Sequence, residues 1–460
     1  MSNSLNTQKL LHSLLVRGTK YLPFADAASA DLPLSRLLRL SLFQVSVGMA
    51  LALLIGTLNR VMIVELHVPA SWVSVMVSMP IVVAPFRALI GFSSDTHKSE
   101  LGWKRVPYIW RGTLVQFGGL AIMPFALLVL SGQGHAAEAP AWIGHLGAGV
   151  AFLLVGAGLH TTQTAGLALA TDLAPEESRP QVVGLMYVML LIGMMISALG
   201  FGSFLKEFSP GRLIQVIQAS ALLTLILNVI ALWKQESRTR ISPNRVTKSE
   251  NFKESWLRFS HGGQAIRRLI AVGLGTIAFS MEDILLEPYG GEVLKLSVGA
   301  TTALTATLAF GGLLGFALAS KVLSKGFDPF RMASLGAICG IPGFLGVIAS
   351  GSLDSTWLFA FGILFIGFGG GLFGHGTLTA TMNLAPKGQS GLALGAWGAV
   401  QATAAGLAIA VGGIIRDVVD SIYQPPLGYE IVYAIEIILL IATVLTMIPL
   451  MKKIPSLISV

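Results

Sequence analysis

The sequence predicts an all-α polytopic membrane protein built from two bundles of six transmembrane helices each. Of the 460 residues, 53% are hydrophobic and only 12% are charged. Apolar runs of about twenty residues recur along the chain, and each is long enough to cross a hydrocarbon core about 30 Å thick. One motif also occurs twice, about half a chain length apart, which indicates two copies of one architecture rather than a solenoid of short repeats.

The repeated motif lies at the end of the fourth span of each half. The first copy ends in Asp172-Leu-Ala-Pro175 and the second in Asn383-Leu-Ala-Pro386. In each half a histidine precedes the motif within a glycine-rich apolar run, at His160 and His375. Because equivalent positions in the two halves carry the same pattern, polar groups that act together are expected where the halves meet.

Twelve apolar runs are predicted to span the membrane. Their ranges are 40–64, 71–93, 107–131, 145–172, 181–205, 212–233, 268–289, 299–322, 331–350, 356–383, 390–416 and 427–450. The chain then divides into five parts: a cytoplasmic amphipathic N-terminal segment (1–39), an N-terminal six-helix bundle (40–233), a basic cytoplasmic linker (234–267), a C-terminal six-helix bundle (268–451) and a cytoplasmic tail (452–460).

Lysine and arginine fix the predicted orientation. They concentrate in the N-terminal segment, in the linker and in the loops on the same side, whereas the other side carries few. By the positive-inside rule, both termini are expected in the cytoplasm. The net charge of +8 is therefore a topology signal and does not indicate nucleic-acid binding. A single cysteine, Cys339, excludes an intrachain disulfide and a cysteine-based metal site.

Charged residues within apolar runs are the first candidate functional groups, because a charge facing lipid costs several kcal/mol unless it is paired or lines a polar cavity. They are Arg60 and Glu65 in span one, and Glu282, Asp283 and Glu287 in span seven. Arg60 and Glu282 are repeat-equivalent and opposite in charge, so we predict that they pair and join the halves on the outer side. Such a pair is either a static ion pair or part of a gate that contacts ligand.

The two histidines are the second candidates. Counted back from the cytoplasmic ends of their helices, at 1.5 Å per residue, His160 and His375 lie near the middle of the membrane. A neutral imidazole there can ligate a metal or hydrogen-bond a neighbouring helix. No second and third ligand occur at helical spacing, so neither histidine belongs to a zinc site.

Six spans, a basic linker and six further spans resemble the major facilitator superfamily, whose halves enclose a central cavity. Gly91 and Asp95, followed by Lys104 and Arg105, resemble the superfamily's conformational loop between spans two and three. The base expected directly after the acid is replaced by Thr96, and the second half has no matching acid. No nucleotide-binding, nucleophile-elbow or zinc-protease motif occurs, so the sequence does not indicate an enzyme.

Several longer strings resemble one branch of that superfamily, the PucC/LhaA or bacteriochlorophyll-delivery family. They are Thr57-Leu-Asn-Arg-Val-Met-Ile-Val-Glu-Leu66, Trp103-Lys-Arg-Val-Pro-Tyr-Ile-Trp-Arg-Gly112, Ala170-Thr-Asp-Leu-Ala-Pro175 and Met281-Glu-Asp-Ile-Leu-Leu-Glu-Pro-Tyr-Gly-Gly291. The resemblance covers roughly residues 35–450.

This resemblance implies a light-harvesting antenna assembly factor in the photosynthetic inner membrane of a bacterium. Such a factor binds bacteriochlorophyll, with carotenoid or lipid as further ligands, and delivers the pigment to antenna α and β polypeptides. Further implied partners are the reaction centre–antenna complex and pigment-synthesis enzymes.

With a pigment as cargo, His160 and His375 become candidate axial ligands of the chlorin magnesium, and Met186 and Met189 on span five become candidate pigment contacts. Ordinary helix packing is the alternative for the methionines. The alternative function is a secondary transporter of a small solute, coupled to protons through Glu282, Asp283 or Glu287.

Overall fold

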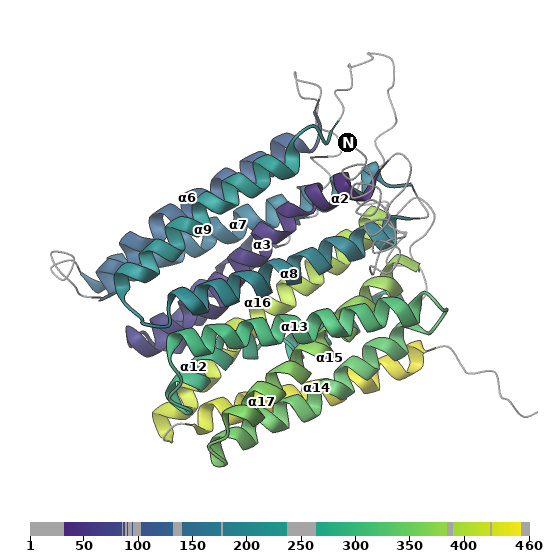
Figure 1. The fold of residues 1–460 in the computed structure, drawn as a ribbon. Helices are drawn as coiled ribbons and strands as arrows, with labels where there is room; N and C mark the ends of the chain where they lie inside the picture. The colour runs from purple at the N-terminus through teal and green to yellow at the C-terminus, as the bar shows by residue number, and fades with distance from the viewer. Residues whose placement is uncertain are drawn as a thin grey trace, which may run out of the picture.

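The computed structural model describes residues 32–84, 86–87, 90, 94, 103–131, 140–175, 178–236, 264–383, 390–423 and 426–451. Every regular element in these ranges is helical, and the helices run side by side as one bundle (Figure 1). Eleven of them are long and apolar enough to cross a membrane, and Ala70–Val82 is a shorter apolar helix at the second predicted span. An all-α polytopic membrane fold is therefore confirmed.

The first half contains α2 (Leu34–Leu40), α3 (Leu42–Leu51), η2 (Ala52–Leu58), η3 (Val61–Glu65), α4 (Ala70–Ser78), η4 (Met79–Val82), α6 (Val106–Ser131), α7 (Ala141–Leu173), α8 (Arg179–Phe204) and α9 (Pro210–Leu232). The second half contains α11 (Ala265–Ala278), η7 (Glu282–Ile284), α12 (Leu286–Glu292), α13 (Val298–Leu323), α14 (Pro329–Ser352), α15 (Thr356–Asn383), α16 (Ser390–Ile422), α17 (Leu427–Met447) and η8 (Ile448–Leu450).

Some helix ends differ from the predicted ones. The first apolar span begins at Leu34, before the predicted start at residue 40, and α16 continues to Ile422 instead of ending at 416. Both extensions mix apolar and charged residues, so the charges there did not end the helices as the predicted limits assumed. Most of the predicted N-terminal segment and linker, and the tail 452–460, lie outside the described residues.

The first helix, α2, begins on the side of the bundle where the last long helix, α17, ends (Figure 1). We call this side, which also carries Arg105 and Asp172, the terminal face, and the other side, which carries Glu65 and Glu292, the opposite face. The two halves meet where α8 packs against α13 and where α4 packs against α16. Helices of one half therefore line the other half along the whole membrane depth.

Glycines allow α13 and α15 to pack backbone to backbone. A Cβ atom at Gly311 would collide with the carbonyl oxygen of Leu364, and one at Gly371 with that of Gly312. Such close approach is the usual means by which helices associate in lipid, where there is no hydrophobic drive between them.

Spans one and seven, which the repeat makes equivalent, are both irregular. The first continues from α3 into two π-helical segments, η2 and η3. The seventh is broken between the end of α11 at Ala278 and the start of α12 at Leu286. Broken backbone inside a membrane is stable only where protein supplies its hydrogen bonds. Here Asn59 Nδ2 donates to the Asp283 carbonyl at 3.2 Å, and Glu436 accepts from the Glu282 amide at 2.8 Å.

We expect Gly311→Ala to lower the free energy of unfolding by about 1–3 kcal/mol, because α13 would have to move away from α15. Gly118→Ala, on α6, is the matched control, since a Cβ atom there meets nothing within 4 Å. Thermal unfolding of the purified proteins measures the difference. Equal midpoints for the two variants would contradict backbone-to-backbone packing at Gly311.

Candidate functional site

A cavity of about 260 Å³ lies between the halves, beside the broken seventh span. Among the described residues, α8 of the first half contributes to its wall, and the second half contributes the break itself, α13, α15 and α16. The lining residues are Tyr187, Leu190, Leu191, Met194, Phe279, Glu282, Asp283, Leu308, Ala309, Gly312, Phe316, Ile366, Gly367, Gly370, Gly371, Gly374, Leu378, Trp397 and Gln401. Apart from two acids, one amide and the tyrosine hydroxyl, the wall is apolar.

Three aromatic rings close the cavity toward the terminal face. Tyr187 of α8 stacks on Phe316 of α13 with ring centroids 6.3 Å apart, and meets Trp397 of α16 edge-on at 6.1 Å. Trp397 donates from its indole nitrogen to the Thr377 hydroxyl at 3.3 Å, which fixes the ring. The two halves thus meet on this side through aromatic contacts, which can separate without leaving an unpaired charge.

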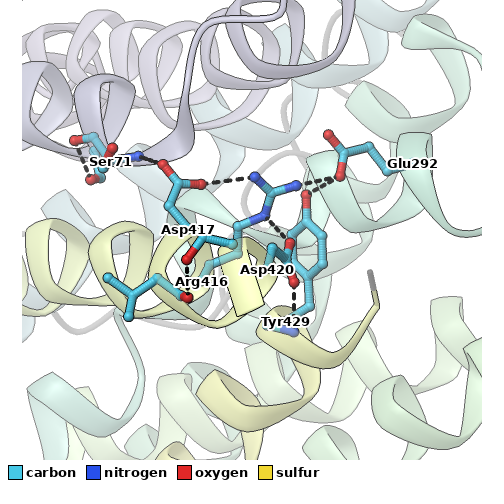
Figure 2. Close-up of polar contacts among 10 residues, drawn as sticks. Ser71, Glu292, Arg416, Asp417, Asp420 and Tyr429 are labelled. Carbon is cyan, nitrogen blue, oxygen red and sulfur yellow. Dashed lines mark hydrogen bonds and ion pairs between the residues drawn. The ribbon is translucent and has the colours of Figure 1, made fainter. Parts of the chain in front are cut away.

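A polar cluster joins the halves at the opposite face (Figure 2). Arg416 of α16 forms ion pairs with Glu292 at 2.6 Å, Asp417 at 2.8 Å and Asp420 at 3.0 Å. Asp417 also accepts from the backbone N–H of Ser71, in the first turn of α4, at 2.6 Å. Tyr429 donates to Glu292 at 2.8 Å. We call this cluster of Ser71, Glu292, Arg416, Asp417, Asp420 and Tyr429 the latch.

The predicted Arg60–Glu282 pair is wrong. Arg60 is 3% exposed and pairs with Glu65 at 2.6 Å, five residues further along its own span. Its second terminal nitrogen donates to the Leu296 carbonyl at 3.2 Å, so Arg60 still connects the halves. Glu282 lies in the break of span seven, with its amide bonded to Glu436. The π-helical turns of span one bring Glu65 within reach of Arg60, which regular helical spacing did not suggest.

The other predicted acids have separate surroundings. Asp283 lines the main cavity together with Glu282. Glu287 accepts from the hydroxyls of Thr305 and Thr302 on α13 and borders a neighbouring cavity of about 30 Å³. Of these three acids, Glu287 is thus the one whose carboxylate accepts from hydroxyl groups in the described part of the chain.

The two histidines lie outside the described lining of the cavity. His375 is 8% exposed and packs against Phe316 with ring centroids 4.1 Å apart, directly behind the cavity wall. His160 lies on α7, and no residue of that helix is among those that line the cavity. The Nδ1 atom of each is buried without a hydrogen-bond partner in the part of the chain that the structure describes.

The methionines of α8 have different surroundings. Met186 is fully buried in a cluster with Phe43 and Leu169, and Met189 packs against the same cluster. Met194, two turns further along α8, lines the cavity instead. Pigment contact by Met186 or Met189 stays a prediction.

The conformational loop is described in part. Gly91 and Asp95 lie outside the described residues, but Arg105 pairs with Asp172, at the end of α7, at 3.1 Å. The carboxylate of Glu236 accepts from the backbone N–H groups of Lys104 and Val106 at 2.8 and 3.0 Å, and so caps the start of α6. Asp172, the acid of the repeated motif, thus binds Arg105 and with it the loop that precedes α6.

Sequence reasoning missed three residues that the structure makes prominent: Arg416, Glu436 and Arg87. Arg416 has Asp417 beside it and Asp420 four residues further on, and this local cluster of charges could have drawn attention to it. Glu436 is the one acid in the middle of the last apolar run, which was the available signal. Arg87 donates to Thr164 at 3.1 Å and to Gln163 at 2.9 Å, both on α7.

The fold is that of the major facilitator superfamily. A D-xylose–proton symporter superposes with a TM-score of 0.70 over 90% of this chain and 96% of its own, at 14% sequence identity. The nucleoside transporter NupG gives a TM-score of 0.61, with 89% and 98% covered, also at 14% identity. At such identities the likeness defines the fold alone.

Within that fold, the chain belongs to the PUCC protein family, whose model matches residues 57–454. Protein PucC of Rhodovulum sulfidophilum is 63% identical, with 87% of this chain and 89% of the relative covered. Protein PucC of Cereibacter sphaeroides is 58% identical, with 95% and 97% covered. A more distant relative from Rhodobacter capsulatus, 26% identical over 88% and 93% of the two chains, is called the bacteriochlorophyll synthase 44.5 kDa chain. The resemblance to the PucC family is thereby confirmed.

We expect Arg416→Gln to destabilise the protein by about 3–5 kcal/mol, because Glu292, Asp417 and Asp420 would be left without a counter-charge in a largely buried site. Arg212→Gln is the control, since Arg212 and Glu207 form an ion pair whose side chains are 42% and 83% exposed. This control should change stability by less than about 0.5 kcal/mol. Similar unfolding midpoints for the two variants would show that the ion pairs of the latch do not stabilise the C-terminal half.

Proposed function

We propose that this protein binds bacteriochlorophyll between its halves and delivers it to antenna polypeptides in the photosynthetic inner membrane. In this proposal both termini lie in the cytoplasm, so the terminal face is the cytoplasmic one. The observation that carries the proposal is the cavity itself: an apolar, aromatic-walled space at membrane depth, between two halves that are held by separable contacts. The relative named as a bacteriochlorophyll synthase chain agrees with pigment as the cargo.

The cavity wall suits a flat, apolar ring. Tyr187, Phe316 and Trp397 offer faces and edges against which a conjugated macrocycle stacks favourably. On the facing side, Gly370 and Gly374 of α15 leave the wall flat, because a Cβ atom at either position would meet nothing closer than 3.9 Å. A sugar or nucleoside would instead need several polar groups to replace its hydrogen bonds to water.

The cavity is too small for a whole pigment molecule in this conformation. Pockets for small molecules measure about 300–1,000 Å³, so a cavity of about 260 Å³ admits only part of a tetrapyrrole. Loading the whole pigment requires the halves to part, as they do in transporters of this fold. The aromatic contacts on the terminal face can open while the Ser71–Asp417 and Arg60–Leu296 hydrogen bonds hold the opposite face.

Two side chains could supply the axial donor that chlorin magnesium takes up. Asp283 offers carboxylate oxygens on the cavity wall, and His375 offers an imidazole nitrogen behind Phe316. Use of His375 requires Phe316 to turn aside. Bound pigment would be cargo, held until an antenna polypeptide provides a better ligand.

A second candidate is proton-coupled transport of a small solute. It is favoured by the acids on the cavity wall, Glu282 and Asp283, in a fold shared with a sugar–proton symporter. The apolar character of the rest of the wall favours pigment.

Filling the cavity should remove the pigment. Gly374→Phe places a ring in the cavity, whereas Gly200→Phe places the same ring on the exposed surface of α8. Overpacking costs about 1–3 kcal/mol, which corresponds to about fivefold to 150-fold weaker binding. We expect the near-infrared pigment band per protein, measured after mild extraction from the native membrane, to fall by that factor for Gly374→Phe only.

Equal pigment in both variants would contradict binding in this cavity. A colourless wild-type protein that carries a solute across vesicle membranes in response to a proton gradient would replace pigment delivery by transport.

A further inference from the structure

Two buried acids meet at the broken seventh span, and the delivery of pigment does not account for them. Glu282, in η7, is 2% exposed, and Glu436, in α17, is fully buried. Glu436 accepts from the backbone N–H of Glu282 at 2.8 Å. The carboxyl group of Glu436 therefore lies against the backbone that carries the other acid.

Each carboxyl group has an oxygen with nothing to bind. The Oε2 atoms of Glu282 and Glu436 are buried and have no hydrogen-bond partner among the described residues. Arg60 and Arg416 lie on spans that pack against span seven, but they pair with other acids: Arg60 with Glu65, and Arg416 within the latch. In the described ranges, no group of three His, Cys, Asp or Glu side chains could hold a metal ion.

The other titratable groups around the pair, in the described elements packed against it, are acids and phenols. Asp283 follows Glu282 in η7, and α12 carries Glu287 and Tyr289. Tyr433 lies on the same face of α17 as Glu436, within electrostatic range of both acids, and its buried hydroxyl also lacks a partner. Nothing described there supplies a positive charge to the pair.

Two ionised carboxylates in this position would repel each other, and each would pay the cost of leaving water. We infer that Glu282 and Glu436 form a proton-binding site that holds at least one proton in this closed conformation. The O–H of one carboxyl group then donates to a free oxygen of the other, which accounts for both unpartnered atoms. Glu282 lines the cavity, so parting the halves admits water to the pair and opens a path for the proton to leave.

Infrared spectroscopy of the purified full-length protein tests this site without any pigment. A protonated carboxyl group has a C=O band distinct from that of a carboxylate. Glu282→Gln/Glu436→Gln removes the pair and keeps its size. The matched control, Glu65→Gln/Glu292→Gln, removes two acids that are ion-paired to arginines.

At neutral pH we expect the protonated-acid band of the wild type to fall clearly in the first double variant and to remain in the control. Each variant is first shown to be monodisperse by gel filtration. An unchanged band in Glu282→Gln/Glu436→Gln, or an equal fall in the control, would overturn the inference. Pigment content is a separate readout, so failure of the proton site leaves the proposed function standing, and the converse holds too.

Discussion

An interrupted helix can lie inside a membrane only if protein groups satisfy the backbone that the interruption frees. At the break in span seven, residues 279–285, side chains from two other spans supply these hydrogen bonds. Asn59 of span one binds a carbonyl group of the break, and Glu436 of the last span binds one of its amides. The break is therefore enclosed by both halves in this structure, and the cavity lies directly beside it.

The contacts that close the cavity differ in kind on its two sides. At the opposite face the halves are joined by the hydrogen bond from the Ser71 backbone N–H to the Asp417 carboxylate of the latch and by the bond from Arg60 to the Leu296 carbonyl. The terminal face is held by the rings of Tyr187, Phe316 and Trp397. Breaking these two hydrogen bonds leaves partly buried polar groups unsatisfied, whereas sliding aromatic rings apart in an apolar medium does not. This asymmetry favours opening toward the terminal face, and it gives a flat apolar cargo a way in that does not cross the latch.

The sequence was sufficient to predict the fold, because the lengths of the apolar runs and the internal repeat can be read from it directly. It also located the acids of span seven beside the eventual cavity. It failed at Arg60, because π-helical turns change which residues of span one lie near each other. It missed Arg416 and Glu436 because Glu292 of α12, which pairs with Arg416, and the η7 backbone, which binds Glu436, lie far away in the chain. The aromatic wall was missed for the same reason, since Tyr187, Phe316 and Trp397 come from three separate spans.

The most direct test of the account is a cryo-electron microscopy map of the protein extracted mildly from pigment-containing membranes. The account predicts density for a tetrapyrrole ring between α8 and α15, in contact with Tyr187, Phe316 or Trp397, with the halves further apart at the terminal face than they are here. Pigment found only on the lipid-facing surface, with the aromatic contacts intact and the cavity closed, would contradict it.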